Sequence, residues 1–147
     1  MDPIWKELGT QELDVYLKLL GDLDHQHCLS HQEAADMLKR ITKYPYYKIF
    51  CLVQGEELLA TYSLIIFENF GHGGMKIAIV ENVVVAERAR HRGIGTEMMN
   101  DAMRRARTEG CYKLMLSSDL KRKGAHAFYD RLGFERHGIS FRTGLIE

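Results

Sequence analysis

The chain has 147 residues, no formal net charge, and 46% hydrophobic and 27% charged residues. This composition is typical of a soluble globular protein, and the length predicts a single domain, residues 1–147, with one core. The neutral balance argues against broad nucleic-acid or membrane-surface binding, and no apolar run approaches the roughly 20 residues that span a bilayer. The N-terminus shows no signal region, and three cysteines without metal-ligand spacing predict reduced thiols in a cytoplasmic protein.

The first third of the chain predicts one short strand and two helices. Residues 4–8 are expected to form the strand. Apolar residues at helical spacing then predict a helix with Thr10 as its N-cap. A Ser-x-x-Glu capping box at Ser30 and Glu33 predicts the start of the second helix.

The middle of the chain predicts β structure. Residues 47–53 and 58–67 are rich in β-branched and aromatic residues, and residues 54–57 between them predict a hairpin turn. Residues 69–74 are glycine-rich and are expected to form a loop. The nearly continuous apolar run 76–85 is typical of a central strand buried on both faces.

The last third alternates helices and strands. We expect a helix over 97–107, a strand over 112–117, a helix over 125–132 and a final strand over 139–145. The mixed order of elements favours an α/β sheet with helices on both faces.

A basic, glycine-bearing turn separates the apolar strand from the helix at 97–107. Glycine lets the backbone approach a ligand closely, and the first N–H groups of a helix attract anions. An ordinary helix N-terminus with solvated arginines would look similar. The turn predicts a phosphate cradle made of Arg90, His91, Arg92, Gly93, Ile94, Gly95 and Thr96.

Two motifs together resemble those of the GNAT superfamily of acetyl-CoA-dependent N-acetyltransferases. Residues 90–95 fit its pyrophosphate motif, Arg/Gln-x-x-Gly-x-Gly/Ala, and residues 125–134 fit Ala-x-x-Phe-Tyr-x-x-x-Gly-Phe. The resemblance implies a mixed, mostly antiparallel sheet of about six or seven strands. It also implies a splayed fourth and fifth strand and about four helices on both faces.

Further residues are similar to those of bacterial small-molecule members. Arg122-x-x-Ala-His-x-Phe-Tyr and the pair Phe141-Arg142 resemble aminoalkylphosphonate N-acetyltransferases. Residues 81–85 resemble the Glu-Asp-Val-Val-Val strand of glucosamine-6-phosphate N-acetyltransferases, except that Asn82 replaces the acidic residue. Arg122 stands where many members carry an asparagine that contacts the pantetheine arm.

The resemblance implies how the cofactor would be held. Backbone N–H groups of the 90–96 turn would bind the pyrophosphate, and Arg122 would lie near the pantetheine arm. The acetyl and pantetheine groups would lie along Val83, Val84 and Val85. The Val83 N–H would polarise the thioester carbonyl. These valines also fit a plain core strand, and the two interpretations are compatible because only backbone groups are recruited.

Two side chains are candidates for proton transfer. Glu81, a carboxylate in an apolar strand, is the candidate general base, directly or through a water, and desolvation there would raise its pKa. It could instead bind substrate electrostatically. Tyr129 is the candidate general acid for the leaving thiolate, or simply a core aromatic residue.

Other polar residues are candidates for contacts with the acceptor. Those at the end of the predicted fifth strand could instead cap a turn, and a loop histidine could be merely solvated. The candidate substrate residues are Asn82, His72, Ser117, Ser118 and Asp119. His25-x-His27-Cys28 has no second cluster and favours an ordinary loop, so we expect no metal.

The predicted function is direct transfer of an acetyl group from acetyl-CoA to a primary amine of a small molecule in a ternary complex. A homodimer is possible in the resembling family, and we expect neither nucleic acid nor membrane as a partner. Two alternatives remain open: a protein Nα- or lysine acetyltransferase, and a non-catalytic acyl-CoA-binding regulator.

Overall fold

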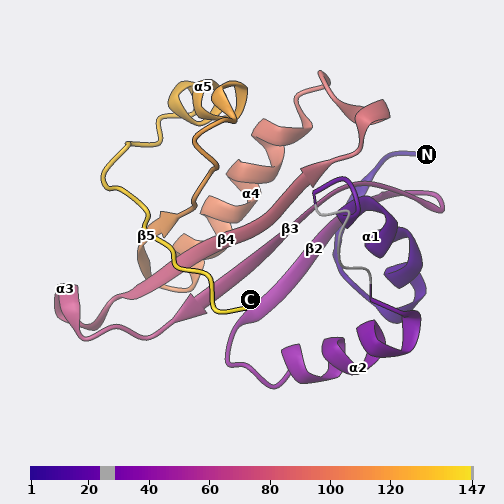
Figure 1. Cartoon of the computed structure of the whole chain (residues 1–147), viewed down its shortest axis with the longest axis horizontal. Coiled ribbons are helices and arrows are strands. Elements are labelled where there is room, and N and C mark those ends of the chain that lie inside the picture. Colours follow the sequence, from indigo (N-terminus) through magenta and orange to yellow (C-terminus); the bar gives the residue numbers. More distant parts are fainter. Residues whose placement is uncertain (24–28, 147) are drawn as a thin grey trace. The chain divides into compact units, whose positions relative to one another are not determined.

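A computed structural model describes residues 1–23 and 29–146 (Figure 1). The chain divides into two compact units, Met1–Met115 and Leu116–Glu147, each of which is described by itself. Within the described residues, no helix is long and apolar enough to cross a membrane.

The first unit contains a five-stranded sheet in the order β1-β2-β3-β4-β5. The first four strands are antiparallel to their neighbours, and β5 runs parallel to β4. Gly55, with φ of 63°, lies in the two-residue turn that joins β2 to β3, as the predicted hairpin requires. The strands are β1 (Ile4–Glu7), β2 (Tyr47–Gln54), β3 (Glu57–Phe67), β4 (Lys76–Val85) and β5 (Cys111–Met115).

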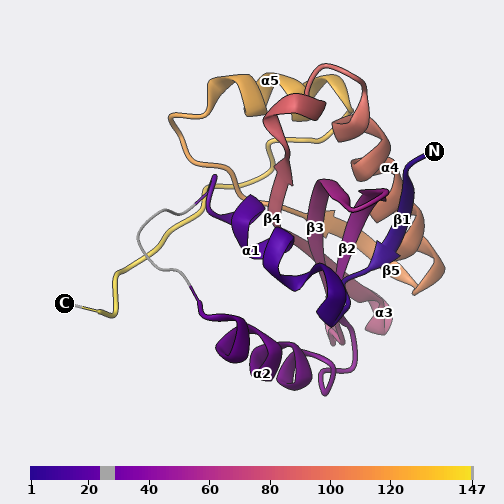
Figure 2. The same cartoon turned by 90° about the vertical axis from the view of Figure 1, so that its right-hand side faces the viewer.

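Helices pack on both faces of this sheet, as predicted (Figure 2). One face is covered by α1 and α2, and the other by α4. The second unit contains α5. The helices are α1 (Leu13–Leu20), α2 (His31–Ile41), the short α3 (Gly71–Gly74), α4 (Ile94–Thr108) and α5 (Lys123–Arg131), with 3-10 turns η1 (Thr10–Glu12) and η2 (Glu87–Ala89).

A buried polar cluster joins α4 to the sheet. Asp101 of α4 is 2% exposed and accepts a hydrogen bond from the Tyr62 hydroxyl of β3. Arg105 Nε donates to Asp101 Oδ2 at 2.9 Å, and the guanidinium lies 3.9 Å from the centre of the Phe50 ring. Burial, together with the Asp101 carboxylate, raises the pKa of Tyr62, so the phenol remains a donor. These contacts fix the axis of α4, and with it the position of its N-terminus.

Local sequence signals set most helix boundaries. Ser30 and Glu33 form the predicted capping box, with two reciprocal bonds of 3.1 Å. The prediction that Thr10 is the N-cap of the first helix is wrong. Thr10 begins η1, and the backbone N–H of Gly9 donates to Glu12 Oε2 instead. Helix α4 begins at Ile94, three residues before the predicted start.

The predicted sheet of six or seven strands is wrong for the described residues, which form five strands. The predicted strand at 139–145 has no strand structure, and Ile139, Phe141 and Leu145 are 82–92% exposed. The alternating pattern of this segment is compatible with a strand, but a strand also needs a partner ladder for its backbone groups. Among the described residues the segment has none.

Candidate functional site

Strand β4 carries a bulge opposite Tyr62. In the register of β3 and β4, Thr61 pairs with Val84 and Ser63 pairs with Glu81. Asn82 and Val83 therefore face a single β3 residue. Asn82 has φ of 51°, in the left-handed region that asparagine tolerates better than most residues. The bulge turns the backbone of Val83 away from the regular ladder.

Only the first half of β4 is paired with β5, because β5 ends at Met115. The pairing of β4 with β5 runs from Lys76 to Ile79. In the described part of the first unit, Val80–Val85 have no partner on β5. The predicted splay stays a prediction, because β5 ends at Met115, which pairs with Ile79. Backbone groups on an unpaired edge of this kind can bind a ligand that adds like a strand.

Glu81 lies beside the bulge, and its side chain is exposed. The predicted desolvation of this carboxylate is therefore wrong: only the first half of β4 is buried on both faces. Glu81 shares a sheet face with Ser63 and with Ile49, the next residue in the same register. Burial raises the pKa of Tyr47 on β2, and the negative charge of Glu81 raises it further. Tyr47 lies in register with Ile79, two residues from Glu81 on the same face of the sheet.

The turn after β4 forms an open helix N-terminus. Gly93 is the N-cap of α4 with φ of 78°, and His91 also has a positive φ of 65°. The first helical bond runs from Glu97 N to Gly93 O at 3.1 Å. The preceding N–H groups, those of Ile94, Gly95 and Thr96, have no partner within the helix and suit an anion.

Two arginines of the turn donate hydrogen bonds to backbone carbonyls of the preceding residues. Arg90 Nε donates to the Val85 carbonyl at 3.2 Å, and an Arg92 terminal nitrogen donates to the Arg88 carbonyl at 3.0 Å. Both side chains are exposed. Their guanidinium groups retain further donors for a phosphate, because each bond uses only one of five N–H groups.

The Acetyltransferase (GNAT) family matches residues 16–134, a span that includes the bulge, the turn and all of α5. The chain belongs to this family. It is an N-acetyltransferase, and membership implies acetyl-CoA as the acetyl donor. The match crosses the boundary between the two units.

Curated relatives are similar over nearly the whole chain. A glucosamine 6-phosphate N-acetyltransferase of Trypanosoma brucei brucei is 33% identical over 94% of this chain and 92% of its own length. A glucosamine 6-phosphate N-acetyltransferase of Arabidopsis thaliana is 26% identical over 84% of this chain and 83% of its own length.

Solved structures share the fold. An acetyltransferase of Trypanosoma brucei superposes with a TM-score of 0.88 at 29% identity, covering 98% of this chain and 100% of that one. An aminoglycoside N-acetyltransferase solved in complex with CoA has a TM-score of 0.80 at 14% identity, covering 98% and 95%.

The second unit holds the other GNAT motif. Tyr129 of α5 packs edge-on against Phe128 and Phe134, with ring centres 5.3 and 5.6 Å apart. Burial raises the pKa of the Tyr129 phenol, and the nearby positive charge of Arg122 lowers it in part. Tyr129 is therefore protonated at neutral pH, as a general acid must be.

The residues before α5 form hydrogen bonds within the turn that leads into the helix. Asp119 Oδ1 accepts from Lys121 N at 2.8 Å, and the Asp119 carbonyl bonds His126 Nε2 at the same distance. Ser117 and Ser118 precede this turn, and β5 ends at Met115, two residues earlier than predicted. Within the second unit, Asp119 thus has the turn-capping role that was the alternative to substrate contact.

His72 lies apart from the bulge. His72 belongs to α3, which precedes the first residue of β4, whereas Glu81 lies in the second half of that strand. The imidazole stacks on Tyr112 with ring centres 4.0 Å apart. Five strand residues, about 17 Å, separate Lys76 from Glu81. The loop predicted at 69–74 contains three residues with positive φ, His72, Gly73 and Gly74.

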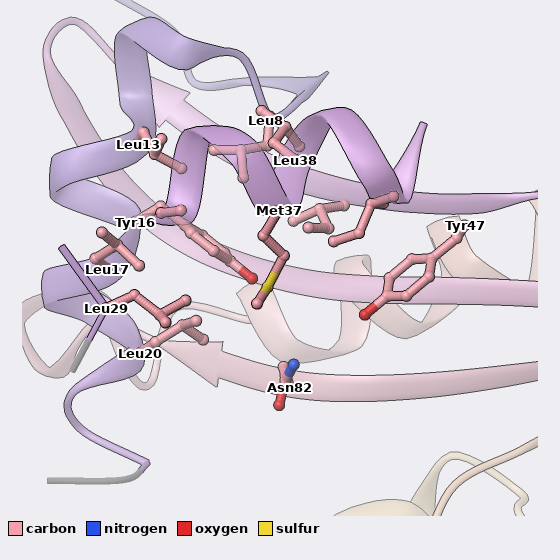
Figure 3. A pocket seen from close by; sticks show the side chains of 13 residues that line it. Leu8, Leu13, Tyr16, Leu17, Leu20, Leu29, Met37, Leu38, Tyr47 and Asn82 are labelled. Carbon is pink, nitrogen blue, oxygen red and sulfur yellow. The ribbon is translucent and has the colours of Figure 1, made fainter. Parts of the chain in front are cut away.

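The metal alternative at residues 25–28 lies outside the described residues. Within 1–23 and 29–146, no three His, Cys, Asp or Glu side chains gather as metal ligands. The structure also adds residues that the sequence did not single out. Tyr16 and Tyr47 lie with Asn82 along one pocket of the first unit (Figure 3). Only the alternation of β2, which puts Tyr47 on the face of Ile49, could have indicated this.

Proposed function

We propose that this protein transfers the acetyl group of acetyl-CoA directly to a primary amine of a small molecule, with an amino-sugar phosphate such as glucosamine 6-phosphate as acceptor. The observation that carries the proposal is the run Glu81–Thr96. A carboxylate, a left-handed bulge, a free strand edge and an open helix N-terminus follow one another there. The acceptor is supported by the relative that is 33% identical over 94% of the chain.

The cofactor would be held mainly by backbone groups. The N–H groups of Ile94, Gly95 and Thr96 suit its pyrophosphate, with added charge from Arg90 and Arg92, and His91 lies in the same turn. The free edge of Val83–Val85 suits the pantetheine amides, and Arg122 would contact the same arm. The bulge would leave the Val83 N–H free to polarise the thioester carbonyl, because a donor released from the ladder can point at the thioester oxygen.

Acetyl-CoA supplies an activated acyl thioester. The acceptor amine must lose a proton to attack it, and Glu81 accepts that proton through a water, as its exposure favours. The C–N bond then forms, the C–S bond breaks, and Tyr129 protonates the departing sulfur. The new amide nitrogen loses its second proton through water, and this proton restores the Tyr129 phenol. Asn82, next to Glu81, would hydrogen-bond the acceptor, while His72, Ser117, Ser118 and Asp119 are weaker candidates for such contact.

Thiol release with glucosamine 6-phosphate tests the proposal. Glu81→Gln is expected to lower kcat about 100-fold while the calorimetric Kd for acetyl-CoA stays unchanged. Glu87→Gln is the matched control, since Glu87 is another exposed carboxylate, six residues further along the chain in η2. Equal activity of the two variants would remove Glu81 from the mechanism.

The same assay separates the alternatives. Binding of acetyl-CoA without turnover of any small amine would favour a protein acceptor or a non-catalytic regulator. Failure to bind acetyl-CoA would refute the assignment of Arg90–Thr96. Sedimentation of the purified chain tests the predicted homodimer, which rests on the family resemblance alone.

A further inference from the structure

A pocket of about 110 Å³ lies between α1, α2 and the sheet of the first unit (Figure 3). Of its 13 lining residues, 10 are aliphatic or methionine, and the other three are Tyr16, Tyr47 and Asn82. None of the described residues that line it is charged. A phosphate would find no cationic partner inside this pocket, whereas an apolar group would lose its contact with water there.

The pocket is polar at one end. In Figure 3, the hydroxyl ends of Tyr16 and Tyr47 turn toward Asn82, and the aliphatic side chains come mainly from the two helices. Asn82 is the bulge residue, and Glu81 precedes it. The pocket therefore leads from the proposed position of the reacting amine to an apolar interior.

The rim also suits an apolar ligand. Leu29 and Met37 line the pocket, yet they are 38% and 37% exposed. Inside, Leu13 and Ala34 are 2% and 4% exposed, so the floor is closed. An engineered apolar cavity of about 150 Å³ holds benzene, and this pocket is somewhat smaller but open at its rim. One small ring or a short aliphatic chain is the group that it can take.

Building on the proposed function, we propose a second acceptor class: primary amines carried on an apolar ring or short chain. The ring fills the pocket between α1 and α2, and the amine lies at Asn82 and Glu81. The reaction is otherwise the same, with an amide and a free thiol as products. Amino-sugar phosphates and arylalkylamines would then both give their proton to Glu81. They would differ in the protein groups that hold the rest of the molecule, which for arylalkylamines are those of the apolar pocket.

Thiol release with 2-phenylethylamine as acceptor tests this inference, with glucosamine 6-phosphate assayed in parallel. The unmodified protein is expected to turn over 2-phenylethylamine. Ala34→Leu, which fills the pocket, is expected to lower its kcat/KM at least tenfold. Ala35→Leu is the matched control, because the neighbouring alanine of α2 does not line the pocket. Met37→Gln changes the exposed rim and keeps the helix intact, and it is expected to raise the KM for 2-phenylethylamine about fivefold.

The outcomes separate the two proposals. Turnover of glucosamine 6-phosphate without turnover of 2-phenylethylamine would overturn this inference and leave the proposed function standing. If neither amine is acetylated, binding of 2-phenylethylamine is measured by ligand-observed NMR. Binding that Ala34→Leu removes and Ala35→Leu retains would support the pocket although the proposed function fails. Absent binding, or equal behaviour of the two variants, would overturn the inference.

Discussion

Gly93→Ala tests the phosphate cradle at the N-terminus of α4. Gly93 has φ of 78°, and a Cβ added there would meet no atom within 4 Å, so the only cost is the backbone conformation. An L-residue in the left-handed region costs about 1–2 kcal/mol. Without ligand the turn can relax out of this conformation, and acetyl-CoA must restore it on binding. The expected result is a Kd about 5- to 30-fold higher.

Gly110→Ala is the matched control at the other end of the same helix. Gly110 has φ of 82° and equally open space around its Cβ position. In Gly110→Ala, the alanine is strained in the left-handed conformation, but it also reduces the conformational entropy of the unfolded chain, which partly offsets the strain. The net expected loss is about 1 kcal/mol in the free energy of unfolding, or about 3 °C in Tm. Calorimetry with acetyl-CoA and thermal melts of both variants make the comparison. An unchanged Kd in Gly93→Ala, or the same loss of affinity in both, would refute the reasoning.

Three further predictions concern the general acid, the buried polar cluster and the bulge. Tyr129→Phe should lower kcat about 100-fold. Because the pKa of the Tyr129 phenol is raised by burial, the wild-type kcat should stay independent of pH beyond the point where an ordinary tyrosine ionises, and the decline at still higher pH should vanish in the variant. Asp101→Ala should lower the free energy of unfolding in urea by about 1–3 kcal/mol, because the buried Tyr62 hydroxyl loses its acceptor while the partly exposed Arg105 can be hydrated instead. Asn82→Val, with a β-branched residue at φ of 51°, should lose more activity than Asn82→Gly, which keeps the backbone conformation and loses only the proposed hydrogen bond to the acceptor; equal kcat/KM values of the two variants would exclude a role for the bulge.

Local signals in the sequence determined most helices and strands and the glycine-bearing turn that begins α4. The capping box at Ser30 and Glu33, the hairpin at Gly55 and the glycine at the start of α4 each act through residues within a few positions. Both GNAT motifs are likewise contiguous, so the family could be identified from them alone. Glu81 was singled out as a carboxylate in an apolar strand, and Asn82 and Val83 through the family resemblance.

Tertiary structure decided the features that depend on distant partners. The alternation at 139–145 predicted a strand, but the described residues offer that segment no ladder, and it stays exposed. Glu81 sits in an apolar strand yet is exposed, because burial depends on what packs over a face and not on its neighbours in sequence. The apolar pocket joins residues from α1, α2, β2 and β4. No local pattern encodes such a volume, because it is the space that the packing of helices on a sheet leaves unfilled.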